Sequence, residues 1–181
     1  MFVPPAFYLD RAAERAEYER HENHVDDPGY RRFLARLAEP LQARLPAASH
    51  GLDFGCGPAP ALATMLREAG HRVACYDSFF HPEERVLTGF YDFVTATEVV
   101  EHLHQPGAEL ERLWGLLRPG GWLALMTKLV IDADAFARWH YIRDPTHVCF
   151  FSAETFHWWA SRHAAVPQRC ADDVVLLRKP A

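Results

Sequence analysis

The chain has 181 residues, of which 49% are hydrophobic and 24% are charged, and its formal net charge is −5 with the eleven histidines neutral. This length and composition are typical of one globular domain with a buried core, and they exclude two full domains. The negative charge argues against the clustered basic surface that nucleic-acid binding requires, and no stretch approaches the roughly 18 apolar residues of a membrane span.

Residues 10–46 predict two helices that precede the core of the domain. The first, over residues 11–24, is strongly charged, and a break at residues 26–29 separates it from the second. The second has one apolar face at helical spacing, made by Tyr30, Phe33, Leu34, Leu37 and Leu41. Pro40 should interrupt or bend this helix. We expect residues 1–46 to form a helical lid over the carboxyl ends of the strands.

From Gly51 onward, strands alternate with helices, a pattern typical of parallel βαβ units. Strands are expected over residues 51–54, 72–76, 91–96 and 122–127. Helices are expected over residues 61–69, 98–103, 108–117, 132–139 and 153–162. Two final strands, over residues 166–169 and 173–178, are close enough to form an antiparallel hairpin. Residues 47–181 therefore predict a doubly wound α/β core, mostly parallel, within a single domain of residues 1–181.

A glycine-rich loop, Gly55-Cys56-Gly57, lies between the first of these strands and the next helix. Glycines here let the backbone turn sharply and let a ligand approach main-chain N–H groups at the helix N-terminus. Asp77 follows Gly55 by 22 residues, at the end of the next strand, where a carboxylate can accept both hydroxyls of a ribose. The pattern predicts a nucleoside cofactor, and the alternative is a simple tight turn with Asp77 as a helix cap.

Two classes of nucleoside cofactor compete for this loop. A nicotinamide dinucleotide needs a third glycine and room for a pyrophosphate, whereas residues 58–60 are Pro-Ala-Pro. Asp53, just before the loop, would repel a pyrophosphate and would attract the ammonium group of a methionine. The residues therefore favour S-adenosylmethionine over a nicotinamide cofactor.

Three segments in order resemble the landmark motifs of class I S-adenosylmethionine-dependent methyltransferases. They are residues 52–57 (LDFGCG), 91–103 (YDFVTATEVVEHL) and 117–121 (LRPGG). They are most similar to the branch of ubiquinone-biosynthesis O-methyltransferases, whose pattern includes E-V-L-E-H-V. The resemblance covers roughly residues 51–127 and implies a Rossmann-like fold with an antiparallel C-terminal strand.

The resemblance also implies which residues bind the cofactor. They are Asp53, Gly55, Cys56, Gly57, Asp77, Ser78, Phe79, Ala96 and Thr97. The residues around the loop would hold the methionine end, Asp77 would hold the ribose, and the turn at residues 96–97 would face the methionine and its sulfonium.

The segment after Asp77 departs from the family pattern. Only fourteen residues, 78–91, lead from Asp77 into the next strand, where the family places a helix, an edge strand and another helix. Fourteen residues hold about one crossover, so we expect the usual edge strand to be missing. Phe79 and Phe80 are then the candidates to cover the adenine.

A group of acids and histidines follows the strand at residues 91–96. On the predicted helix, Glu98, Glu101 and His102 are spaced i, i+3, i+4, which places them on one face as candidate ligands of a divalent ion. The arrangement resembles the E-x-x-E-H motif of small-RNA 2′-O-methyltransferases, which binds a metal together with a later histidine. The matching later residue is His147, with His140 and Asp144 as alternates; the alternative is a set of solvated helix acids. Asp144 is also the candidate to accept the second ring N–H of a metal-binding histidine.

These features predict an S-adenosylmethionine-dependent enzyme that methylates an oxygen of a small molecule. The candidate catalytic residues, as general bases, are His102, His140 and His147. A divalent metal, if bound, would instead lower the pKa of an acceptor hydroxyl. Two alternatives stay open, a nicotinamide-dependent oxidoreductase and a non-catalytic protein that binds S-adenosylmethionine.

The four cysteines are scattered, with no C-x-x-C pair and no dense spacing. This pattern favours free thiols in a reducing compartment over a disulfide framework. A secretory signal has a basic segment before an apolar run, and the first ten residues lack this pattern. We therefore expect a cytoplasmic protein without a membrane span.

Overall fold

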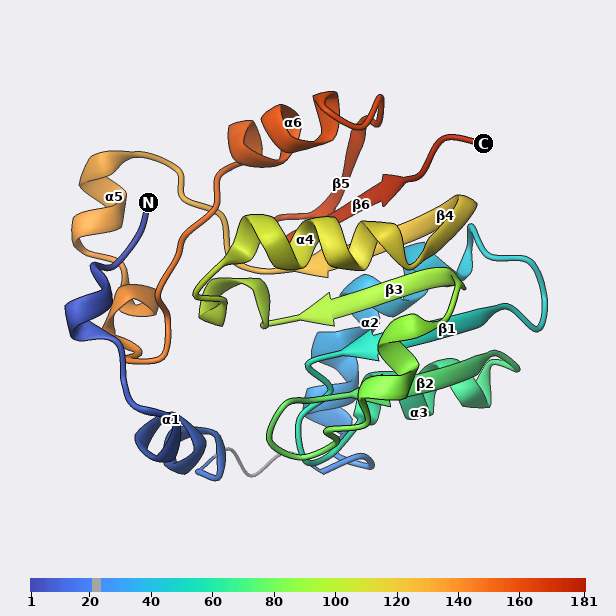
Figure 1. Cartoon of the computed structure of the whole chain (residues 1–181), viewed down its shortest axis with the longest axis horizontal. Helices are drawn as coiled ribbons and strands as arrows, with labels where there is room; N and C mark the ends of the chain where they lie inside the picture. The colour runs from blue at the N-terminus through green and yellow to red at the C-terminus, as the bar shows by residue number, and fades with distance from the viewer. Residues whose placement is uncertain (21–23) are drawn as a thin grey trace.

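A six-stranded sheet forms the centre of the computed structural model, which describes residues 1–20 and 24–181 (Figure 1). Within these residues the strand order is β2-β1-β3-β4-β6-β5. The strands are β1 (His50–Phe54), β2 (Arg72–Tyr76), β3 (Tyr91–Thr97), β4 (Leu117–Met126), β5 (Pro167–Ala171) and β6 (Val174–Arg178). The first four strands pair in parallel, and β6 is antiparallel to both β4 and β5. The predicted doubly wound fold and its C-terminal hairpin are confirmed.

The edge strand that we expected to be missing is absent from the described residues. Between β2 and β3, the chain makes a single bridge from Asp77 to His81 and a short 3-10 helix, η2 (Glu84–Thr88). Strand β2 is therefore the edge of the sheet, because the short connection leaves room only for η2 beside it.

Helices cover both faces of the sheet. Helices α2 (Pro28–Gln42) and α3 (Ala61–Glu68) pack on one face, where Leu37 and Leu66 are fully buried against Phe93 of β3. Helices α4 (Pro106–Gly115) and α6 (Ala153–Ser161) pack on the other face, around Leu113 and Phe156. No helix in the described ranges is both long and apolar enough to cross a membrane.

The N-terminal helices occupy two different places, which corrects part of the expected lid. The apolar face of α2 lies on the sheet, so this helix belongs to the core, and Pro40 lies inside it without ending it. Helix α1 (Arg11–Tyr18), capped by the Asp10 side chain, has no buried residue. It lies beyond the carboxyl ends of the strands, at the lower left of Figure 1, and η1 (Pro5–Phe7) lies between it and α5 (Ala133–Ala137) at the upper left. The expected continuation of α1 through residues 21–23 lies outside the described residues.

The helix expected over residues 98–103 does not form, and this prediction is wrong. Glu98 has a left-handed backbone, with φ of 51°, and its N–H donates to the Met126 carbonyl at 2.8 Å. That bond keeps the chain beside β4 for one more residue, so only a 3-10 turn, η3 (Val100–His102), follows. Glu98 is therefore not on a helix face shared with Glu101 and His102, as the spacing had suggested.

Candidate active site

A cleft of about 1340 Å³ lies at the carboxyl ends of the parallel strands. Its wall includes residues of α1, the glycine loop, the end of β2, the turn after β3, and η4 (His140–Arg143). Ligands of open α/β sheets bind at this end because the loops that follow the strands converge there. The predicted site residues can therefore be placed relative to this one cavity.

The glycine loop forms the floor of the cleft. Both Gly55 and Gly57 have left-handed backbones, with φ of 71° and 64°, which side chains other than glycine adopt only with strain. A Cβ at Gly55 would lie 2.3 Å from a Val99 methyl carbon, whereas a Cβ at Gly57 would meet nothing within 4 Å. Gly55 thus allows close packing below the loop, and Gly57 leaves open space above it.

Asp77 is held firmly at one side of this loop. Its carboxylate accepts hydrogen bonds from the backbone N–H of Gly57 at 3.0 Å, of Phe79 at 2.8 Å and of Phe80 at 3.1 Å. These bonds tie the glycine loop to the turn after β2. Asp77, Ser78 and Phe79 all line the cleft, as the sequence predicts for a ribose-binding region.

Two predicted cofactor residues are more buried than the sequence suggests. Asp53 lines the cleft but is almost fully buried, and its carboxyl accepts a hydrogen bond from the Thr95 hydroxyl at 2.7 Å. Burial raises its pKa to about 7, against the opposing effect of the Thr95 bond. The Ala96 side chain packs in the core, whereas Thr97 lines the cleft. Any contact of residue 96 with a ligand is therefore restricted to its backbone.

Helix α1 closes the cleft from the outside. Its Arg11 guanidinium lies 4.4 Å from the centroid of the Phe79 ring and donates to the Ser78 carbonyl at 2.8 Å. The Tyr18 ring makes edge contacts with Phe79 and with His102, at centroid distances of 5.6 and 5.4 Å. Tyr18 thus contacts both the Asp77 side of the cleft and its histidine side.

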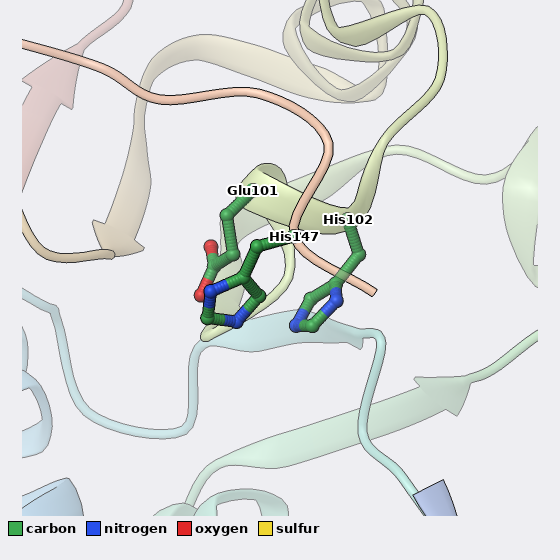
Figure 2. Close-up of side chains that lie close together, drawn as sticks. All are labelled: Glu101, His102 and His147. Atoms are coloured by element: carbon green, nitrogen blue, oxygen red, sulfur yellow. The ribbon is translucent and has the colours of Figure 1, made fainter. Parts of the chain in front are cut away.

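Glu101, His102 and His147 come together on the histidine side (Figure 2). One ligating atom from each residue lies within 4.8 Å of those from the other two. Glu101 is fully buried, and its Oε2 atom has no hydrogen-bond partner among the described residues. Ligand atoms that are each about 2.1 Å from one metal ion lie about 3.0–4.2 Å from one another. Small rotations of the three side chains would therefore bring their donor atoms to distances that suit a shared metal ion.

Backbone carbonyls orient both imidazoles of this cluster. His147 Nδ1 lies 2.7 Å from the Tyr141 carbonyl oxygen, and His102 Nδ1 lies 3.2 Å from the Thr146 carbonyl oxygen. A carbonyl oxygen only accepts, so each neutral ring must carry its proton on Nδ1 and keep its lone pair on Nε2. Metal-binding histidines are oriented by this kind of outer hydrogen bond.

Asp144 had been expected to be that hydrogen-bond partner, and this expectation is wrong. Its carboxylate accepts bonds from the backbone N–H and the hydroxyl of Thr146 instead. Its Oδ2 atom lies 3.8 Å from His147 Nε2, on the side of the ring away from the Nδ1 bond. Asp144 therefore faces the ligating nitrogen rather than the orienting one.

Tyr141 connects the cluster to Glu98 through contacts that its position in the sequence does not reveal. Its hydroxyl contacts Glu101 Oε1 and lies 3.2 Å from Glu98 Oε2. Burial raises the pKa of both carboxyls, and the Glu98 charge raises that of Glu101 further. Glu98 is thus a neighbour of the cluster through Tyr141. The only signal in the sequence was the position of Tyr141 in the aromatic loop after β4.

His140 lies at the same cleft but outside the cluster. It is exposed, and its Nε2 atom is 3.0 Å from Lys128 Nζ. The Lys128 ammonium also lies 5.2 Å from the centroid of the Tyr141 ring. Of the three candidate bases, the structure brings His102 and His147 together and places His140 beside a lysine.

A protein-family model described as a methyltransferase domain matches residues 9–164, which include the glycine loop, Asp77 and the acid–histidine cluster. The chain belongs to this family. The resemblance to class I S-adenosylmethionine-dependent methyltransferases is therefore confirmed, and the nicotinamide alternative is not supported.

Solved structures agree on the fold of this methyltransferase domain. A 1,6-didemethyltoxoflavin-N1-methyltransferase from Burkholderia thailandensis, with 1,6-didemethyltoxoflavin and S-adenosylhomocysteine bound, superposes with a TM-score of 0.68 at 19% identity. The match covers 94% of this chain and 87% of that one. An O-methyltransferase family protein from the same organism gives 0.66 at 16% identity, over 97% of this chain and 62% of that one.

Curated relatives match the methyltransferase domain over a shorter region. Ubiquinone biosynthesis O-methyltransferases of Sodalis glossinidius and Shewanella sp. are 32% and 27% identical over 85 residues, 47% of this chain. That region is 34% and 36% of the respective relatives, so the match spans about a third of their length.

Proposed function

We propose that the cleft binds S-adenosylmethionine and directs its methyl group to an oxygen of a small-molecule acceptor. The proposal rests on one observation, which is that a single cleft has a candidate cofactor site on one wall and a candidate catalytic site on the other. One wall has the glycine loop and Asp77, and the other has the acid–histidine cluster. S-adenosylmethionine, when bound, supplies a methyl group on a sulfonium, which an acceptor oxygen can displace.

The residues on the first wall fit this cofactor. Gly57 leaves open space where any other residue would place a Cβ, so a ligand can approach the loop backbone. The Asp77 carboxylate is positioned by three backbone N–H groups and can still accept bonds from ribose hydroxyls through its remaining lone pairs. Cys56 and Ser78 flank these groups, Phe79 offers a ring to the adenine, and Thr97 faces the methionine.

The residues on the second wall can activate an acceptor hydroxyl. His102 and His147 each keep an Nε2 lone pair when neutral, so either can accept the acceptor's proton as the methyl group is transferred. His140 is a third candidate base, but its contact with Lys128 places it farther along the cleft wall.

The finer proposal is that Glu101, His102 and His147 hold a divalent ion. A buried carboxylate oxygen that has no hydrogen-bond partner within residues 1–20 and 24–181, together with two imidazoles oriented through Nδ1, forms a donor set that suits zinc, manganese or iron. Three protein ligands would leave positions for the acceptor, whose hydroxyl the ion would acidify. Glu98, the fourth residue predicted as a ligand, would act through Tyr141 instead.

The net charge and the cleft also support the remaining proposals about partners and location. A chain with net charge −5 and a cleft of this size suits a small-molecule acceptor better than nucleic acid. All four cysteines are free thiols, which is typical of the reducing cytoplasm.

Calorimetry with the full chain tests the cofactor and the metal together. We expect one S-adenosylhomocysteine per chain, no binding of NAD, and one Mn²⁺ or Zn²⁺ per chain. Turnover of catechol and vicinal-diol acceptors should fall on treatment with a chelator and return with the ion. Tight NAD binding without a response to S-adenosylhomocysteine would exclude the proposal. Cofactor binding without turnover of any hydroxyl acceptor would favour the non-catalytic alternative.

An Asp77→Ala variant is expected to bind S-adenosylhomocysteine about 10–150-fold more weakly. The loss corresponds to roughly 1.5–3 kcal/mol for charge-assisted bonds to the ribose and for the bonds that hold the loop. Calorimetry gives the dissociation constants. Asp172→Ala, which removes an exposed carboxylate far from the loop in sequence, is the matched control. Equal affinity of the Asp77→Ala variant and the wild type would remove Asp77 from the site.

A further inference from the structure

Two cysteines lie together beneath the cofactor loop. The Cys56 side chain lies close enough to Cys75 of strand β2 for each thiol to shift the pKa of the other, and the Cys56 thiol donates to the Gly57 carbonyl at 3.6 Å. The backbone brings them together because the N–H groups of Gly55 and Cys56 both donate to the Tyr76 carbonyl, at 2.7 and 3.2 Å. Formation of a disulfide would therefore act directly on the glycine loop.

A fixed guanidinium lies against the second of these sulfurs. Arg67 of α3 donates from Nη2 to Cys75 Sγ at 3.2 Å, and its Nε and Nη2 also donate to the Val73 carbonyl at 3.2 and 2.6 Å. The neighbouring Cys56 thiol lowers the pKa of the Cys75 thiol and the Arg67 guanidinium lowers it further, against the effect of burial. A stabilised thiolate is the form of cysteine that reacts with oxidants.

The other two cysteines lack this environment. Cys149 is buried, and its thiol donates to the Val100 carbonyl at 3.0 Å, so it is a structural group. Cys170 lies on the outer strand β5, and its thiol donates to the Gln168 carbonyl at 3.7 Å. Cys75 is half-buried, so small oxidants can reach it, and Cys56 is next to it to complete the reaction.

We propose that Cys75 is an oxidation site that Cys56 resolves into a disulfide. The Cys75 thiolate attacks a hydroperoxide, so an S–O bond forms, the O–O bond breaks, and hydroxide or an alkoxide leaves and takes a proton from solvent. Cys56, after losing its proton, then attacks the sulfenic acid, so the S–S bond forms, the S–O bond breaks, and water leaves. Two thiols are oxidised and one peroxide is reduced.

The disulfide changes the loop that the proposed function uses. An S–S bond of about 2.05 Å is shorter than any hydrogen-bonded contact between sulfurs, so Cys56 must move toward β2. Gly55 and Gly57 on either side hold left-handed conformations that this movement disturbs. Oxidation should weaken cofactor binding, and this consequence rests on the proposed function. Formation of the disulfide does not depend on that function.

Hydrogen peroxide treatment of the 181-residue chain tests this site. Trypsin should release a disulfide-linked pair of peptides, residues 45–67 and 73–85, each of which contains one cysteine. Affinity for S-adenosylhomocysteine should fall on the order of tenfold and recover with dithiothreitol. Cys170→Ser should behave like the wild type. Cys75→Ser, or Cys75→Ala if the serine variant folds poorly, should keep its affinity under oxidation.

Two results would overturn the proposal. One is the absence of the linked peptides under conditions that oxidise Cys170, and the other is unchanged affinity of a protein that mass spectrometry shows to be fully linked. Failure of the reduced protein to bind S-adenosylhomocysteine would count against the proposed function, while the linked peptides would still report on the thiol pair.

Discussion

Methyl transfer is expected to fall by about 10²–10⁴-fold in a Glu101→Gln variant, with affinity for S-adenosylhomocysteine nearly unchanged. Glu101 is fully buried, and its Oε2 atom has no partner in the described part of the chain. An amide keeps the shape of the side chain but removes the charge that would bind a divalent ion. Single-turnover assays with excess metal, together with calorimetry of Mn²⁺ binding, measure both losses.

The matched control for this variant is Glu111→Gln. Glu111 accepts bonds from Trp159 at 3.1 Å and from His163 at 2.8 Å, away from the cleft, so its activity should match the wild type. A Glu101→Gln enzyme with normal metal binding and normal turnover would contradict the metal proposal. Loss of turnover with metal binding retained would support instead a role of Glu101 in orienting the histidines.

A Gly55→Ala variant is expected to lose about 2–4 kcal/mol of unfolding free energy and most of its cofactor binding. The new Cβ would lie 2.3 Å from a Val99 methyl carbon, and the backbone would keep a φ of 71° that alanine tolerates poorly. Val99 packs against the core and cannot withdraw without opening a cavity. Urea denaturation monitored by circular dichroism gives the change.

Gly57→Ala separates the two effects. Its Cβ would meet nothing within 4 Å, so only the strain of a φ of 64° remains, worth about 1 kcal/mol. The same Cβ occupies the proposed ligand space, so cofactor affinity should fall sharply while stability changes little. Equal stability losses at the two glycines would mean that the contact with Val99 relaxes at little cost.

The fold was predictable because its signals are local. Strands with buried runs, helices with one apolar face and the glycine loop each occupy a short segment, and their alternation indicates a parallel sheet. The missing edge strand followed from length alone, since fourteen residues do not hold two helices and a strand. The lid was predicted too broadly, because the apolar face of α2 does not reveal which surface covers it.

The arrangement of the acid–histidine cluster depends on contacts that spacing does not reveal. A spacing of i, i+3, i+4 indicates one helix face, but the bond from Glu98 N–H to the Met126 carbonyl, between residues 28 positions apart, prevents that helix. His147 was identified through the resemblance, but the backbone carbonyl that orients its ring could not be predicted from the sequence. The contacts of Tyr141 could not be predicted for the same reason, since its hydroxyl meets Glu98 and Glu101 only after the loop folds back.

The edge position of β2 has a consequence for aggregation. An exposed edge strand offers unpaired N–H and C=O groups to any other extended chain, and proteins commonly protect such edges with short covering segments or charges. Here η2 lies beside β2, and residues 82–85, Pro-Glu-Glu-Arg, add a proline and charged side chains. The short connection that replaces a strand therefore also protects the β2 edge of the sheet from pairing with a second molecule.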